Sequence, residues 1–183
     1  MSKNAESREI ERTLEQWRAE SESAQRLCTP PGLATREQLV GLSGVAFFTA
    51  TMNGQLPPPP MSATTEFVII SFSYGHIVMQ GSPGLKFQNT MGSIHGGWIA
   101  TILDSVVGCA VHTTLSAGMG YATAELKVSY FRPLSEAIGL VRAEGKVLSS
   151  GKKIAFAEGT LCGPDGKKYA HATTTCAVFT GTA

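Results

Sequence analysis

The stretch "NTMGSIHGGWIATILDS", Asn89 to Ser105, opens the longest periodic apolar segment in the second half of the chain. It predicts a helix over about residues 96 to 115, with little polar surface and therefore enclosed on several sides. The apolar positions of this helix are Ile99, Ile102, Leu103, Val106, Val107, Ala110 and Val111. One carboxylate, Asp104, lies among them. A buried carboxylate without a partner is costly, so either the structure compensates it or a function uses it.

Strand-like segments rich in Val, Ile, Thr, Phe and Tyr lie on both sides of this helix. They cover residues 64–73, 76–82, 121–131, 138–149, 152–162 and 168–180. Short turns between the later segments favour antiparallel pairing. Two strands, one enclosed helix and four more strands make the plan of a hotdog domain. We therefore predict an α+β hotdog fold, in which a long antiparallel six-stranded sheet wraps around a central helix.

The first part of the chain has a different pattern. Residues 6–27 combine charged residues with apolar positions at helical spacing, which predicts an amphipathic helix that ends before Pro30-Pro31-Gly32. A short helix is expected near residues 36–50, and the four prolines at 57–60 predict an extended connector. The expected organisation is an N-terminal helical extension with a proline connector, residues 1–60, followed by a hotdog domain, residues 61–183.

Composition excludes several classes of partner. The chain has 183 residues, 43% of them hydrophobic, and a formal net charge of +1, so it has no strong field that would attract nucleic acid or an anionic membrane. The N-terminal sequence lacks a secretory apolar region, and no apolar run has the length that spans a bilayer, so we expect a cytoplasmic protein. Four widely spaced cysteines are expected to be buried thiols rather than metal ligands or disulfides.

The start of the central helix can take part in acyl-transfer chemistry. Free N–H groups in a first helical turn can bind a carbonyl oxygen that becomes negative, and Gly96 has no side chain to block access. Asp104 can activate water or attack a carbonyl directly. In the alternative interpretation, Gly96 and Gly97 only permit tight packing, and Asp104 is a satisfied carboxylate bonded to a neighbouring hydroxyl such as that of Thr101 or Ser105.

Helix geometry limits how Gly96 and Asp104 can act together. Eight residues of helix separate their backbones by roughly 12 Å. One thioester cannot contact both residues of a single chain. If both serve one reaction, Gly96 comes from one subunit and Asp104 from another, which predicts an obligate dimer with its site at the interface.

The segment "NTMGSIHGGWIATILD", followed by "GYATAELKVSYFRP", resembles the hotdog acyl-coenzyme A thioesterases of the phenylacetic-acid-degradation (PaaI-like) group. The resemblance is strong from Asn89 to Pro133 and weaker from "QLPPPP" to the C-terminus. It implies hydrolysis of an acyl-coenzyme A thioester. We predict that this proceeds without metal or organic cofactor, in a homodimer that assembles into a homotetramer as a dimer of dimers. No nucleic acid or membrane partner is expected.

The resemblance also implies roles for individual residues. The match to Asp104 is the general base or nucleophile, and the match to Gly96 supplies the N–H that polarises the thioester carbonyl. The match to Asn89 helps to hold the attacking water or the carbonyl. The match to His95 lies at the edge of the site and braces the loop, while the match to Thr123 bonds the catalytic carboxylate or the water.

Each of these roles has a structural alternative. Asn89 can cap a turn before Gly92. His95 can be purely structural, since a thiolate leaving group needs little acid assistance. Strict alternation along the strand places Thr123 on one polar face, opposite a face with Ala124, Leu126, Val128 and Tyr130. The other members of that polar face are Glu125, Lys127 and Ser129.

Three further residues are candidates for substrate binding: Gly97, Trp98 and Arg132. Trp98 directly follows the two glycines and either lines an acyl pocket or belongs to the core. Arg132 either meets the phosphates of coenzyme A or is solvated. An aromatic acyl group such as phenylacetyl and a medium aliphatic chain fit the sequence equally well.

The sequence is also compatible with two other functions. The first is a hydratase or dehydratase acting on an acyl thioester, which would pair a histidine such as His95 with Asp104 across subunits. The second is an acyl-coenzyme A sensor without catalysis, whose N-terminal segment binds DNA or a partner. Six basic residues against seven acidic ones in residues 1–60 argue against a DNA-binding arm.

Overall fold

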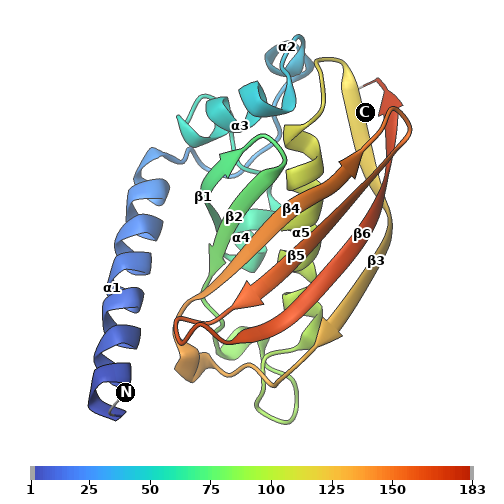
Figure 1. Ribbon diagram of the computed structural model, residues 1–183. Helices are drawn as coiled ribbons and strands as arrows, with labels where there is room; N and C mark the ends of the chain where they lie inside the picture. The colour runs from blue at the N-terminus through green and yellow to red at the C-terminus, as the bar shows by residue number, and fades with distance from the viewer. Residues whose placement is uncertain (1–2, 182–183) are drawn as a thin grey trace.

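The computed structural model describes residues 3–181 and shows one six-stranded antiparallel sheet around a central helix (Figure 1). The helices are α1 (Lys3–Leu27), α2 (Arg36–Leu39), α3 (Gly44–Met52), α4 (Met61–Thr65) and α5 (Gly96–Thr113). The strands are β1 (Phe67–Ser73), β2 (His76–Gly81), β3 (Met119–Tyr130), β4 (Val141–Ser150), β5 (Ile154–Cys162) and β6 (Lys168–Thr180). Their order in the sheet is β1-β2-β4-β5-β6-β3. The predicted hotdog architecture is confirmed.

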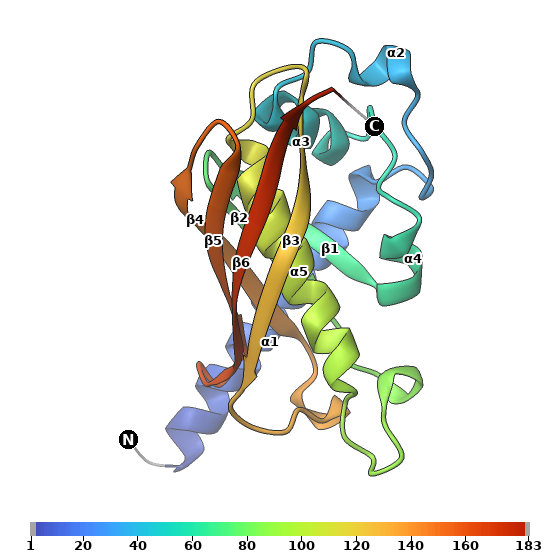
Figure 2. The same ribbon diagram turned by 90° about the vertical axis from the view of Figure 1, so that its right-hand side faces the viewer.

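Helix α5 is the centre of the core, as its apolar circumference predicts. Its residues Ile102, Leu103 and Val106 are fully buried. Two glycines let the strands approach the helix closely. A Cβ on Gly145 of β4 would lie 2.2 Å from the Val106 carbonyl oxygen, and one on Gly159 of β5 would also collide with the helix. The sheet therefore curves around α5 (Figure 2).

The edge strand β3 contains a bulge that strict alternation does not anticipate. Thr123 pairs with Cys176 of β6, but Glu125 pairs with the adjacent Thr175, so Ala124 is an extra residue. The prediction that Thr123 shares a face with Glu125 is therefore wrong. The bulge shifts the alternation by one, and Thr123 lies on the helix side of the sheet together with Leu126, Val128 and Tyr130.

Two boundaries in the N-terminal half also differ from expectation. The helix expected over residues 36–50 is divided into α2 and α3, because Gly41 takes a left-handed conformation (φ 81°) and Ser43 caps a new helix. The first strand was expected from residue 64, but residues 61–65 form α4, and Glu66 ends it at φ 58°. A left-handed residue cannot continue a strand, so β1 begins at Phe67.

The extension packs against the sheet rather than lying free. Trp17 of α1 is 8% exposed, and the guanidinium of Arg142 on β4 lies 4.4 Å from the centre of its indole ring. Arg142 also forms an ion pair with Glu20. In the later part of the extension, the Gly44 N–H of α3 donates to the carbonyl of Leu115, just after α5, over 2.9 Å. Helix α1 thus runs beside β1 (Figure 1).

The cysteines are free thiols, but the expectation that all are buried holds only in part. Cys176 is buried, Cys109 and Cys162 are partly buried, and Cys28 at the end of α1 is exposed. Across residues 3–181, no helix combines the length and the apolar character needed to cross a bilayer.

Candidate active site

The start of α5 is organised by His95, which is its N-cap. His95 Nδ1 accepts the Gly97 N–H over 2.9 Å, and the His95 N–H donates to the Phe87 carbonyl over 2.7 Å. The Gly97 donor is thereby used. The Gly96 N–H finds no acceptor within residues 3–181. Of the two glycines, Gly96 carries the available donor, at the positive end of the helix dipole.

Tyr130 at the end of β3 covers Gly96. Its hydroxyl donates to the Gly96 carbonyl over 3.0 Å, and a Cβ on Gly96 would lie 3.3 Å from the phenol carbon and oxygen. Tyr130 is 51% exposed, so one side of the ring faces solvent. Sequence reasoning missed this neighbour because it placed Tyr130 on the face opposite Thr123. The bulge at Ala124, which no local sequence signal marks, brings both onto the helix side.

Asp104, two turns further along α5, is half-buried and takes its partner from β3. Thr123 donates its hydroxyl to Asp104 Oδ1 over 3.1 Å. The other hydroxyls considered for this carboxylate bond helix carbonyls instead, Thr101 that of Gly97 and Ser105 that of Thr101. The expected partners Thr101 and Ser105 are therefore wrong, although a hydroxyl, that of Thr123, does bond the carboxylate. Its second oxygen accepts no hydrogen bond from the described part of the chain.

Two groups that interact with Asp104, Cys109 and Tyr121, are neutral at physiological pH, and so is His112 two turns further along α5. Burial raises the pKa of the Cys109 thiol to about 12, and Asp104 itself contributes to this increase. Burial also raises the pKa of the Tyr121 phenol well above its ordinary value. Burial lowers the pKa of His112, which favours the neutral imidazole. Within residues 3–181, Asp104 forms no ion pair with a positive side chain.

Asn89 lies in the loop before α5, where its side chain makes three hydrogen bonds. Its Oδ1 accepts the N–H of Met91 over 2.9 Å and that of Ser93 over 3.3 Å, and its Nδ2 donates to Ser93 Oγ over 2.9 Å. Gly92 in the same turn has φ 78°, a conformation that glycine adopts readily. In the structure, Asn89 shapes the loop that leads to His95.

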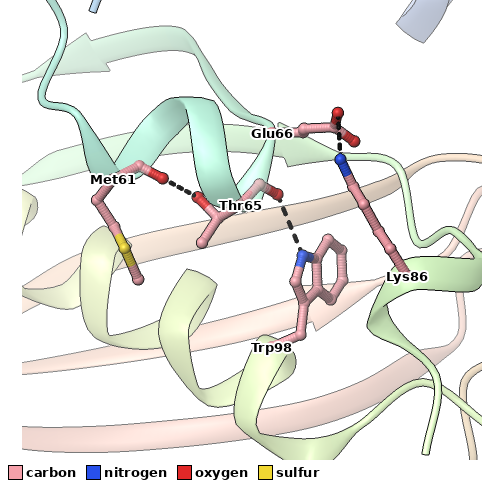
Figure 3. Close-up of polar contacts among 5 residues, drawn as sticks. All are labelled: Met61, Thr65, Glu66, Lys86 and Trp98. Atoms are coloured by element: carbon pink, nitrogen blue, oxygen red, sulfur yellow. Dashed lines mark hydrogen bonds and ion pairs between the residues drawn. The ribbon is translucent and has the colours of Figure 1, made fainter.

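Trp98 is 6% exposed, and its indole points toward Thr65 of α4 (Figure 3). Its Nε1 donates to the Thr65 carbonyl over 3.1 Å, and its ring packs between Phe67 and Phe87 with centroid distances of 5.1 and 5.2 Å. Together with His95 and Gly97, it lines an open pocket of about 440 Å³. Trp98 is thus a core residue that also borders the pocket at the start of α5.

Arg132 lies just beyond β3. Its guanidinium donates to the Lys168 carbonyl and lies 5.8 Å from the ring centre of Tyr169. An arginine has five N–H donors, so these contacts leave others available. Within residues 3–181, no three His, Cys, Asp or Glu side chains gather as a metal-binding set.

The hotdog fold and the carboxylate on its central helix define the class of protein. The profile of the thioesterase superfamily matches residues 91–170, a range that includes Gly96, Asp104 and Thr123. A protein of Saccharolobus solfataricus, named provisionally as an esterase, is 31% identical over 104 residues, which are 57% of this chain and 72% of the relative. The chain belongs to the thioesterase superfamily.

Similar solved structures include PaaI-like proteins, in agreement with this placement. A phenylacetic acid degradation-related protein from Ralstonia eutropha JMP134, assigned as a thioesterase, is 29% identical with a TM-score of 0.66, over 72% of this chain and 98% of its own. The PaaI protein of Escherichia coli shares the fold at 20% identity and a TM-score of 0.61, over 67% and 86% of the two chains. The smu.793 protein of Streptococcus mutans UA159, solved with acetyl CoA, shares the fold at 24% identity and a TM-score of 0.58. The match covers 64% of this chain and 91% of the smu.793 chain.

Proposed function

We propose that this protein hydrolyses an acyl-coenzyme A thioester to the free acid and coenzyme A. The observation that carries the proposal is the Asp104 carboxylate, held at one oxygen by Thr123 and open at the other, on the helix whose first residue offers a free N–H. The superfamily supports a thioester substrate, and the acetyl CoA bound to the Streptococcus mutans neighbour supports coenzyme A as the carrier.

The reaction needs Gly96 and Asp104 from different subunits, because roughly 12 Å of helix separates them within one chain. The Gly96 N–H binds the thioester carbonyl oxygen and stabilises the negative charge that develops on it. Asp104 of the other subunit takes a proton from water as the water oxygen attacks the carbonyl carbon. The C–S bond then breaks, and coenzyme A leaves as a thiolate.

A second route uses the same two residues. Asp104 attacks the carbonyl carbon itself, expels the thiolate and forms a mixed anhydride, which water then hydrolyses. A single turnover in ¹⁸O-labelled water tests for this route. Label in the Asp104 side chain indicates an anhydride that water opens at the Asp104 carbonyl. Label only in the product acid means that water attacked the acyl carbon, which is the result expected for general base catalysis.

The other candidate residues have supporting roles in this proposal. Thr123 orients the carboxylate, His95 fixes the helix start, and Asn89 holds the loop before it. Gly97 and Trp98 border the thioester at the helix start, and Arg132 offers its remaining donors to a phosphate of coenzyme A.

The proposed assembly is a cytoplasmic homodimer that pairs further into a homotetramer. In the same proposal, residues 1–60 form an extension to a thioesterase domain at 61–183. Sedimentation of the purified chain measures the assembly, and a protein that stays monomeric while turning over substrate contradicts the interfacial site.

A free-thiol assay over aryl and aliphatic acyl-coenzyme A esters tests the activity itself. Thiol release above the Asp104→Asn background is the expected result. Binding of several esters without release would instead indicate a sensor. Hydration of an enoyl thioester without release would place the protein among the hydratases.

A further inference from the structure

A large cavity lies between the N-terminal extension and the central helix. It has a volume of about 1160 Å³. Its walls come from the second half of α1, the segment that follows it, α3, the proline connector, α4, β1, β2 and one side of α5. In Figure 2, α1, α3 and α4 surround β1 beside α5. Because the family profile begins at residue 91, the extension that closes this cavity lies outside the matched region.

The inner end of the cavity is next to the candidate catalytic carboxylate. Ser105, Cys109 and Tyr121 line this end. Ser105 directly follows Asp104. Tyr121 lies two residues before Thr123 on the helix side of β3, and Thr123 bonds Asp104. The cavity therefore begins beside the residues that flank Asp104 and Thr123, although these two do not line it themselves.

The walls are suited to an apolar group without charge. Leu27, Phe47, Phe48, Ile69 and Met79 contribute apolar side chains. The cysteine and histidine of α5 that line the cavity are kept neutral by burial. At the far end, the Glu20 carboxylate is already paired with Arg142, so it offers no free charge to a ligand. Glu66, the other carboxylate of the lining, is paired with Lys86. The lining residues include no lysine or arginine, so an anionic group would lose its water here without a cationic partner.

The size of the cavity favours large acyl groups over small ones. Its volume of about 1160 Å³ exceeds the roughly 300–1,000 Å³ typical of pockets for drug-sized ligands. The lining part of α1, Glu20 to Leu27, is about 10 Å long at the rise of a helix. An acetyl or phenylacetyl group would leave most of this space empty, and the apolar walls would remain in contact with water.

We propose that the N-terminal extension forms an acyl-chain pocket, and that the substrate carries a medium-length or long aliphatic acyl chain. The proposal rests on the proposed thioesterase function and adds the substrate class to it. The thioester carbonyl lies at Asp104, and the alkyl chain runs past Ser105 and Cys109 toward α1. Longer chains bury more methylene groups, so catalytic efficiency rises with chain length until the pocket is filled.

Two tryptophan substitutions on the same helix test the pocket. Ala24→Trp introduces an indole into the cavity, since Ala24 lines it. Ala19→Trp introduces the same side chain at an exposed position of α1 outside the cavity, and is the matched control. The measured quantity is the ratio of kcat/KM for dodecanoyl-coenzyme A to that for butanoyl-coenzyme A. We expect Ala24→Trp to lower this ratio about tenfold, the effect of keeping roughly two methylene groups in water. Ala19→Trp should leave the ratio within twofold.

A second variant and a binding measurement keep the test decisive. If Ala24→Trp does not fold, as judged by thermal unfolding, Ala63→Trp narrows the same cavity from α4. Affinity for a non-hydrolysable dodecyl thioether of coenzyme A should fall in the cavity variants and not in Ala19→Trp. Equal ratios and equal affinities in all variants overturn the pocket while leaving the thioesterase function intact. If no ester is hydrolysed, the proposed function fails, and the thioether affinities alone decide whether the pocket exists.

Discussion

The Thr123 hydroxyl donates to Asp104 Oδ1 over 3.1 Å, and this bond joins the edge strand β3 to the central helix α5. It exists because the bulge at Ala124 turns Thr123 toward the helix. The carboxylate is thus oriented by a residue from another element, while its second oxygen stays free for a reactant. That combination is suited to a base or nucleophile rather than to a structural carboxylate.

Asp104→Asn keeps the size of the side chain and removes the charge. We expect kcat to fall by roughly two to four orders of magnitude, as for the loss of a general base. Binding of the dodecyl thioether of coenzyme A and the thermal unfolding curve should remain close to wild type. Near-normal turnover would contradict the mechanism, and an unfolded variant would support a structural role for this carboxylate.

Thr123→Ala removes the hydroxyl that orients Asp104. We expect kcat to fall about tenfold with little change in KM, because a hydrogen bond to a charged group contributes roughly 1.5 kcal/mol at the low end of its range. Thr123→Ser is the control, since it retains the hydroxyl and should recover most of the rate. If serine and alanine behave alike, the hydroxyl does not position the carboxylate.

Tyr130→Phe removes the hydrogen bond to the Gly96 carbonyl and keeps the ring beside it. The expected effect is a loss of about 0.5–1.5 kcal/mol in the free energy of unfolding, measured by urea denaturation. Turnover should change by less than about tenfold, because the N–H that binds the oxyanion is intact. A loss of turnover above a hundredfold with unchanged stability would mean that the phenol acts on the substrate.

His112 gives the protein a defined pH dependence. Its imidazole packs against Phe47, Phe48 and Tyr121, and burial lowers its pKa in the folded state. The unfolded chain therefore binds a proton at higher pH than the folded one. The contribution of neutral His112 to the free energy of unfolding is fully present above the pKa of the imidazole in the unfolded chain, about 6.5. This contribution is lost as the pH falls through the lower pKa of His112 in the folded protein. His112→Phe should flatten the decrease in unfolding free energy between pH 7 and pH 5, measured by urea denaturation at each pH. An unchanged decrease would exclude His112 as its source.

The sequence predicts the hotdog fold well because its signals are local and redundant. The apolar circumference of α5 and the turn residues between strands indicate one enclosed helix and an antiparallel sheet. The contacts of the candidate site depend on features that alternation cannot reveal. The extra residue at Ala124 decides that Thr123 meets Asp104 and that Tyr130 meets Gly96. Tertiary contacts also determine the short helix α4, which replaces the expected start of β1.

The central claim is that Gly96 and Asp104 serve one site from different subunits. Gly96→Pro removes the N–H donor at a first helical position, where proline is tolerated. His95 before it has ψ 132°, which suits a residue preceding proline. Gly96→Ala is the control for the added Cβ, because it keeps the N–H. Gly96→Pro and Asp104→Asn should each be nearly inactive alone, while Gly96→Ala should retain more activity than Gly96→Pro.

Mixing the Gly96→Pro and Asp104→Asn proteins is the most direct test. In a two-fold dimer of one subunit of each kind, one site has both defects and the other has none. After subunit exchange, confirmed by native mass spectrometry, random pairing should restore about a quarter of the wild-type activity per site. If the exchanged mixture stays inactive, Gly96 and Asp104 do not act across the interface, and the account of the active site is wrong.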